Sequence, residues 1–101
     1  MSAESILTAL RDGEVVVTTP SEWEAASSAF EVLEEHDTLV AGMLRILQGP
    51  SGLVALEEPK RTERVLRPLR DPDQVRAFVA DRLASYERMW DGCGCRVQYY
   101  R

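Results

Sequence analysis

The sequence predicts an α+β domain over residues 1–101: a two-layer sandwich in which a four-stranded, mainly antiparallel sheet carries helices on one face. Three observations lead to this class. The chain has the size of one domain, with 45% apolar and 29% charged residues, as is usual for a globular protein. Some segments have apolar residues at helical spacing, and others have short β-branched runs. Proline, glycine and capping residues separate these segments clearly.

The first two elements along the chain are a helix and a strand. Ile6 and Leu10 share one helical face, which indicates a helix over residues 3–11. Three consecutive valines at 15–17 indicate a strand over residues 14–19, because β-branched side chains are stiff and suit a buried strand.

A capping box then predicts the start of a second helix. The Thr19 hydroxyl can accept a hydrogen bond from the Glu22 amide while the Glu22 carboxylate reaches back, and Pro20 suits the first helical position. Apolar residues recur at helical spacing from Trp23 onward. This pattern predicts a helix that continues to about Glu35.

Residues 38–48 allow two interpretations. Apolar residues at helical spacing before the stop signal Gly49-Pro50 favour a second, shorter helix over this range. The alternative is a strand over 43–48 that turns through residues 49–52 into the next strand, because a short apolar run fits either structure.

The second half of the chain has clearer signals. Residues 53–58 and 63–69 are predicted to form a hairpin, connected by residues 59–62. Pro68 cannot donate to a strand ladder, so it belongs at an edge or at a strand end.

The best-defined helix follows this hairpin. Asp71 is an acidic N-cap, Pro72 takes the first helical position and Gln74 the third, and Gly92 is a typical helix stop. The last residues, 95–100, are predicted to form a closing strand.

The predicted order is an N-terminal helix followed by β-α(α)-β-β-α-β. This order is similar to the ferredoxin-like sandwich, and the resemblance implies a four-stranded sheet with right-handed β-α-β crossovers. That fold carries many unrelated functions, so the resemblance implies none in particular.

Charge and composition limit the classes of partner that the protein is expected to bind. Twelve Lys and Arg against 17 Asp and Glu give a net charge of −5, which argues against nucleic acid, since phosphate neutralisation requires a basic surface. Neither a signal-peptide pattern nor an apolar run of membrane-spanning length is found, so we expect a cytoplasmic protein with no membrane partner. A protein partner is expected, and a homo-oligomer would also fit.

Cys93 and Cys95 are the candidates for redox or metal chemistry. They could form a small-ring disulfide around Gly94, bind zinc or another thiophilic metal, or fill the edge of a core. Their predicted place after a helix C-terminus disfavours thiolate, which argues against an activated nucleophile. A closed zinc site needs four ligands, so a metal would require ligands from a second subunit.

Arginines in and after the second hairpin strand are the anion-binding candidates: Arg64, Arg67 and Arg70. Strand alternation puts Arg64 and Arg70 on one face, and Arg67 on the other with Arg61. The preferred interpretation is that these arginines protect an edge strand and pair with neighbouring carboxylates.

These features predict a small cytoplasmic accessory or interaction domain in which the Cys-Gly-Cys pair has a redox or metal-linked role. The alternative is a structural or regulatory protein–protein module, dimeric and without thiol chemistry, that uses an open sheet edge or sheet face. An enzyme is the least favoured class. No nucleophile–base pair or phosphate loop can be recognised, so no catalytic residue is assigned.

Overall fold

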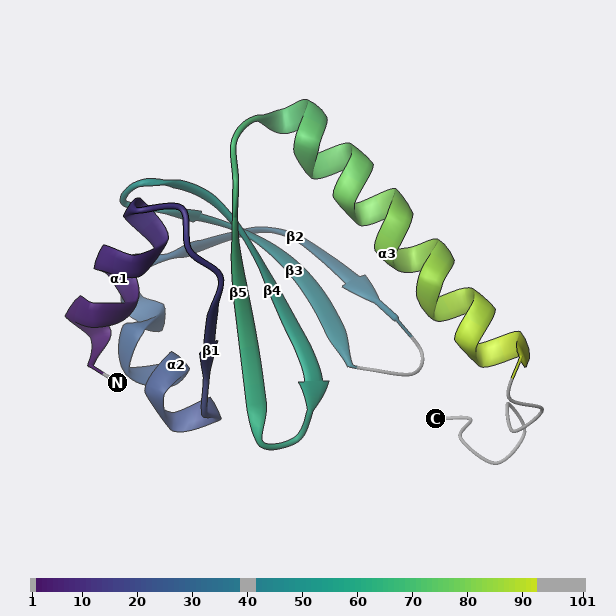
Figure 1. The fold of residues 1–101 in the computed structure, drawn as a ribbon, viewed down its shortest axis with the longest axis horizontal. Helices are drawn as coiled ribbons and strands as arrows, with labels where there is room; N and C mark the ends of the chain where they lie inside the picture. Colours follow the sequence, from purple (N-terminus) through teal and green to yellow (C-terminus); the bar gives the residue numbers. More distant parts are fainter. Residues whose placement is uncertain (1, 39–41, 93–101) are drawn as a thin grey trace.

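The computed structural model describes residues 2–38 and 42–92, and their path is shown in Figure 1. The elements in chain order are α1 (Ala3–Arg11), β1 (Val16–Thr18), α2 (Pro20–Ala26), the short 3₁₀ helix η1 (Ser27–Ala29), β2 (Glu31–Asp37), β3 (Met43–Gly49), β4 (Gly52–Lys60), β5 (Glu63–Leu69) and α3 (Pro72–Gly92). The fold is therefore α+β, as predicted. None of the helices within the described ranges has the length and apolar content needed to cross a bilayer.

The strands form one antiparallel sheet in the order β1-β5-β4-β3-β2. The described residues thus contain five strands, and the prediction of four was wrong. The structure does not show the ferredoxin-like order. The predicted closing strand over 95–100 lies outside the described residues.

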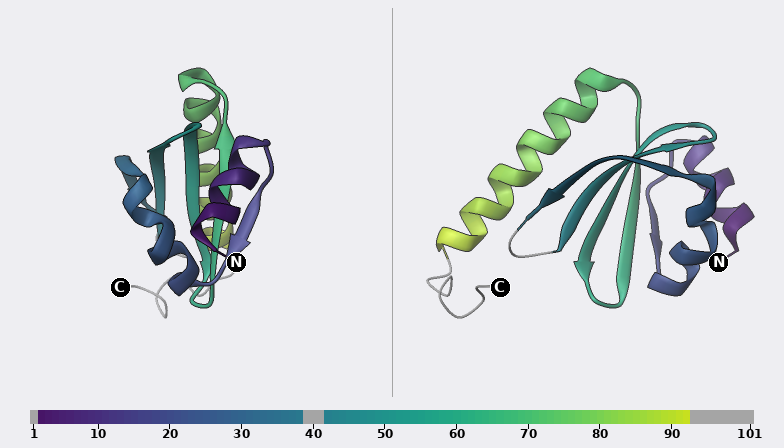
Figure 2. Two further views of the ribbon diagram at one scale, coloured as in Figure 1. Left: turned by 90° about the vertical axis from the view of Figure 1, so that its left-hand side faces the viewer. Right: turned by 180° about the vertical axis from the view of Figure 1, so that it is seen from behind.

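Helices cover both faces of this sheet, as Figure 2 shows, so the predicted arrangement with helices on one face was wrong. Successive strand residues point to opposite faces. Val54 and Leu56 of β4 belong to a core shared with α1 and α2, whereas Ala55, between them, belongs to a core shared with α3. We call these two sides the α1/α2 face and the α3 face.

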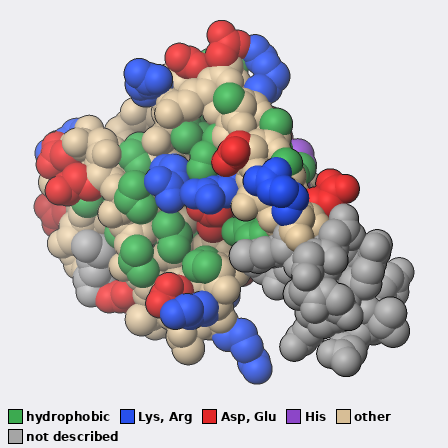
Figure 3. All heavy atoms as spheres, turned by 45° about the vertical axis from the view of Figure 1, so that its right-hand side comes forward, with side chains coloured by type: hydrophobic (Ala, Val, Ile, Leu, Met, Phe, Trp, Pro, Cys, Tyr) green, Lys and Arg blue, Asp and Glu red, His purple; other side chains and the backbone are tan. Residues whose placement is uncertain are grey.

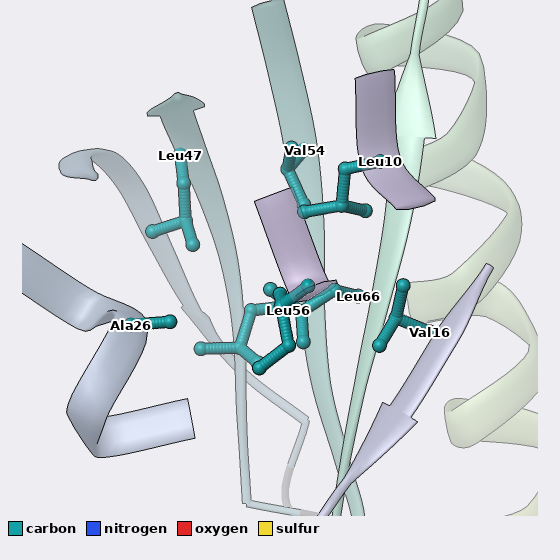
Figure 4. Close-up of a cluster of buried hydrophobic side chains, with 8 residues drawn as sticks. Leu10, Val16, Ala26, Leu47, Val54, Leu56 and Leu66 are labelled. Carbon is teal, nitrogen blue, oxygen red and sulfur yellow. The ribbon is translucent and has the colours of Figure 1, made fainter. Parts of the chain in front are cut away.

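The core of the α1/α2 face is a cluster of buried apolar side chains from both helices and four strands (Figure 4). Its members are Ile6, Leu10, Val16, Ala26, Leu47, Val54, Leu56 and Leu66. The core of the α3 face is smaller, and consists of Ile46, Ala55, Leu69 and Val75, with Leu53, Phe78 and Val79 packed against it.

The capping box predicted at the start of α2 is confirmed. The Glu22 amide donates to Thr19 Oγ1 at 3.2 Å, and the Thr19 amide donates to Glu22 Oε1 at 2.8 Å. The predicted extension of this helix to Glu35 was wrong, because α2 ends at Ala26. The apolar residues that suggested a longer helix have another explanation. Phe30 lies beyond the end of α2 and packs against Trp23, with ring centroids 5.2 Å apart.

The preferred helix over residues 38–48 was also wrong, and its alternative was correct, since residues 43–49 form β3. This strand is covered on both faces: Leu47 faces α1 and α2, while Ile46 faces α3. A strand buried on both sides has a continuous apolar run instead of an alternating one, and such a run fits a helix equally well.

Candidate functional site

β2 is an edge strand whose outer side faces solvent. β3 pairs with its inner side, and within residues 2–38 and 42–92 no strand pairs with its outer side. Six of its seven residues are exposed, and His36 is partly exposed. Backbone N–H and C=O groups therefore form an accessible row along this edge, and such a row is a template for a further strand.

The opposite edge of the sheet differs in length. β1 has only three residues, Val16–Thr18, and pairs with β5 on its inner side. A strand this short offers few backbone groups, and shortness is one way in which proteins protect sheet edges. β2, with seven residues, is the longer of the two edges.

The register of β2 against β3 is regular over its second half. Pairs run from Glu34 opposite Ile46 to Asp37 opposite Met43, and a register shift lies between Val32 and Glu34. Leu33 lies at this shift and has no opposite residue on β3 in the register. Both apolar residues of β2 are half exposed, Val32 at 51% and Leu33 at 47%.

The side chains of β2 are mainly carboxylates. Its sequence, EVLEEHD, contains four acidic residues and no Lys or Arg. Glu34 Oε1 lies 2.9 Å from His36 Nε2, and Glu35 Oε2 lies 2.9 Å from Arg45 Nε on β3. Both carboxylates remain substantially exposed, at 47% and 51%. The edge therefore combines open backbone groups with negative charge.

A row of alternating charges crosses the sheet and ends at this edge. Arg64 Nε on β5 lies 3.3 Å from Glu58 Oε2 on β4, and Arg45 Nη1 on β3 lies 3.5 Å from Glu58 Oε1. Arg45 in turn pairs with Glu35 on β2. We call these four residues the ion row. Because its last member, at the exposed edge, is a carboxylate, the row presents negative charge to whatever lies beside β2.

A second charged cluster lies between α3 and the sheet. Glu57 is 7% exposed, and its Oε2 lies 3.3 Å from Arg82 Nε and accepts a hydrogen bond from the Tyr86 hydroxyl at 3.1 Å. The guanidinium groups of Arg67 and Arg82 lie 5.7 and 5.1 Å from the centre of the Phe78 ring. Figure 3 shows basic side chains among hydrophobic ones on the side of the molecule where α3 lies.

This cluster changes the titration of its tyrosine. Partial burial raises the pKa of Tyr86 above its ordinary value of 10.0, and the neighbouring Glu57 carboxylate raises it further. Both causes act against the negative phenolate. The hydroxyl therefore remains a donor to Glu57 over the whole neutral range, and the cluster fastens the second half of α3 to the sheet.

The three anion-binding candidates, Arg64, Arg67 and Arg70, have different surroundings in the structure. Arg64 belongs to the ion row with Glu58, whereas Arg67 points to the α3 face and lies against Phe78. Arg70 follows the end of β5, where its backbone amide donates to Gln74 Oε1. The separation of Arg64 from Arg67 is the one that strand alternation predicts.

The redox or metal candidates Cys93 and Cys95 lie outside the described residues. Among the residues that are described, no group of three His, Cys, Asp or Glu side chains could hold a metal ion.

The β2 edge was missed by the sequence prediction because its composition favours a helix. Glutamate is a good helix former, and three of the seven residues of β2 are glutamates. Only Val32 is β-branched there, so no local pattern indicates a strand. The edge arises from pairing with the following strand, β3, and residues 31–37 do not encode that pairing by themselves.

Comparisons with protein-family models, with curated proteins and with solved structures gave no match. The functional argument below therefore relies on the described residues and their contacts.

Proposed function

We propose that this protein is a protein–protein interaction module that binds an extended segment of its partner as an additional strand along β2. The observation that carries the proposal is the exposed, seven-residue edge of β2. In this mode of recognition, backbone hydrogen bonds supply affinity and alternate side chains supply specificity.

The burial of the inner neighbour, β3, supports the proposal. β3 holds β2 in place, and its residues Leu44, Ile46 and Leu47 are at most 1% exposed. An edge that is already ordered loses little conformational entropy when a partner strand is added, so more of the hydrogen-bond and contact energy appears as affinity. The half-exposed Val32 and Leu33 add apolar contact area on the same strand.

The test begins with a displayed library of short random peptides. Selected peptides are titrated into isotope-labelled protein, and amide chemical shifts and hydrogen exchange are followed. The proposal expects shifts centred on residues 31–37 and slower exchange of β2 amides in the complex. Peptides that shift only helix amides, or a library that yields no binder, would contradict it.

Two matched valine variants separate edge binding from a general loss of apolar surface. Val32→Ala on β2 should weaken the selected peptides, whereas Val17→Ala on β1 should not. Val17 is 58% exposed against 51% for Val32, and both are valines of edge strands. Equal effects of the two variants would mean that β2 is not the binding edge.

The thiol chemistry of Cys93 and Cys95 is a separate proposal, which the sequence alone supports. The two cysteines follow α3 directly, since that helix ends at Gly92. Intact mass under reducing and oxidising conditions, with metal analysis of the same sample, tests it. Loss of one pair of hydrogens on oxidation, or bound metal, would support a switch or a clip. If neither is found, the cysteines are structural residues.

A further inference from the structure

We propose that the segment bound along β2 is basic, with lysine or arginine at alternate positions so that one cation lies beside Glu35. This inference rests on the proposed function of β2 and adds the chemistry of the partner. It is carried by the ion row and by the distribution of carboxylates along the edge.

The ion row gives the position of the cation. Its members alternate in sign from Arg64 through Glu58 and Arg45 to Glu35, each belonging to the next strand of the sheet. On one face of an antiparallel pair, side chains of facing residues lie about 5 Å apart. A basic residue on a sixth strand would therefore contact Glu35 and continue the alternation.

Further carboxylates of β2 support the same partner. Asp37 lies two residues from Glu35 and shares its face of the sheet, because the two residues pair with Met43 and Arg45 of β3. Basic residues at alternate positions of a partner strand would face both carboxylates. Glu31 and Glu34 add negative charge on the other face, opposite Gln48 and Ile46.

A second copy of this edge is a poor partner by the same reasoning. Two antiparallel β2 strands would place carboxylates beside carboxylates, and like charges in facing positions destabilise a strand pair. The net charge of −5 adds a long-range preference for a basic partner and against a second copy of the chain.

The experiment uses the full chain and three synthetic peptides of equal length. Each alternates threonine with one other residue: lysine, glutamine or glutamate. Binding is followed by amide shifts of residues 31–37 at low and high salt. We expect the lysine peptide to bind about tenfold more tightly than the glutamine peptide, and the glutamate peptide not to bind. The advantage of lysine should shrink as salt is added, because exposed ion pairs are screened.

The outcomes distinguish this inference from the proposed function. Equal binding of the lysine and glutamine peptides, with shifts on β2, would overturn the basic partner and leave strand addition standing. If all three synthetic peptides fail to bind while library peptides bind on β2, the basic partner is likewise overturned and strand addition stands. Failure of every peptide, library and synthetic alike, would overturn both.

Two isosteric variants test the role of Glu35. Glu35→Gln should weaken the lysine peptide several-fold and leave the glutamine peptide unchanged. Glu24→Gln is the matched control, because Glu24 is exposed on α2 and its substitution changes the net charge equally. Equal losses in the two variants would show that only net charge matters, and would overturn the assignment of the cation to Glu35.

Other occupants of the edge are also recognised in this experiment. β2 amides that point away from β3 and are nevertheless protected from exchange in the free monomer would show that the chain covers its own edge, since only the amides that donate to β3 should be protected there. Dimers detected by light scattering, with protected β2 amides that the lysine peptide does not expose, would show that a second copy occupies it. Either result would overturn a basic partner.

Discussion

The two faces of the sheet are held against their helices by different interactions. On the α1/α2 face, the buried cluster is entirely apolar, and its eight members are at most 3% exposed. On the α3 face, four buried apolar residues are accompanied by the Glu57, Arg82 and Tyr86 contacts. The first face therefore depends on packing, and the second depends on packing near the start of α3 and on polar contacts further along it.

This difference determines how each face should respond to substitution. Apolar packing in a closed cluster is lost together with the whole fold, because every member contacts several others. Polar contacts at the margin of a helix can be lost locally, because water replaces the missing partner. We therefore expect the α1/α2 face to determine global stability and the α3 face to determine how firmly α3 is attached.

The largest effect should come from Leu66→Ala on β5. Leu66 is fully buried in the α1/α2 cluster, so removing its side chain leaves a cavity among side chains that cannot close in. The free energy of unfolding should fall by about 2–5 kcal/mol, measured by urea denaturation. Val17→Ala on β1, where the side chain is 58% exposed, is the control and should cost less than about 0.5 kcal/mol. Equal costs would show that the cluster is not the main source of stability.

The next largest effect should come from Gly49→Ala on β3. A Cβ atom at this position would lie 2.6 Å from Cε1 and 2.9 Å from Cδ1 of Phe30, so the ring that packs on Trp23 would have to move. We expect a loss of about 1–3 kcal/mol in unfolding free energy. The same substitution in a Phe30→Leu background should cost less, because the obstructing ring is gone. An equal cost in both backgrounds would exclude this contact as the cause.

A smaller and more local effect should come from Glu57→Gln on β4. The variant removes the charge that Arg82 and Tyr86 share, at a cost of about 1–2 kcal/mol. Amide hydrogen exchange should accelerate in α3 more than in β3 or β4, because the loss affects helix attachment. Glu87→Gln, at an exposed position of α3, should change neither quantity. Uniform acceleration across the sheet would contradict the contrast between the two faces.

Local signals in the sequence predicted the helix starts and the hairpin correctly. The Thr19 capping box is present. Asp71 caps the start of α3, because the Gln74 amide donates to Asp71 Oδ1 at 2.8 Å. These features could be predicted because the interacting atoms lie within three residues of each other. The strands over 53–58 and 63–69 are likewise joined by a short connection that the sequence marks.

The predictions failed where tertiary contacts override local preference. Glutamate-rich β2 is a strand because β3 pairs with it, and β3 has no alternation because both of its faces are covered. The candidate site has the same origin. The ion row joins residues 35, 45, 58 and 64. The predicted hairpin indicated that Arg64 would pair with a neighbouring carboxylate, as it does with Glu58, but no sequence spacing indicates that Arg45 and Glu35 would join them.

The smallest expected effect is that of Tyr86→Phe, and the dependence of this effect on pH tests the contrast between the two faces of the sheet. Tyr86→Phe removes the hydroxyl that donates to Glu57 and should cost about 1 kcal/mol at neutral pH. Burial and the Glu57 carboxylate raise the pKa of Tyr86 in the folded protein above its ordinary value of 10.0. The folded state therefore holds this proton more tightly than the unfolded state, so its stabilising contribution is complete below the unfolded pKa and is lost as the pH rises through the folded one.

Urea denaturation of both proteins from neutral pH to above pH 10 tests this linkage. The wild-type advantage over Tyr86→Phe should be constant at neutral pH and shrink in the alkaline range, since phenylalanine does not titrate. An advantage that stayed constant through the alkaline range would mean that Tyr86 titrates alike in the folded and unfolded states. The contact of the Tyr86 hydroxyl with Glu57 would then contribute nothing to stability, and the polar attachment of α3 would depend on the Glu57–Arg82 pair.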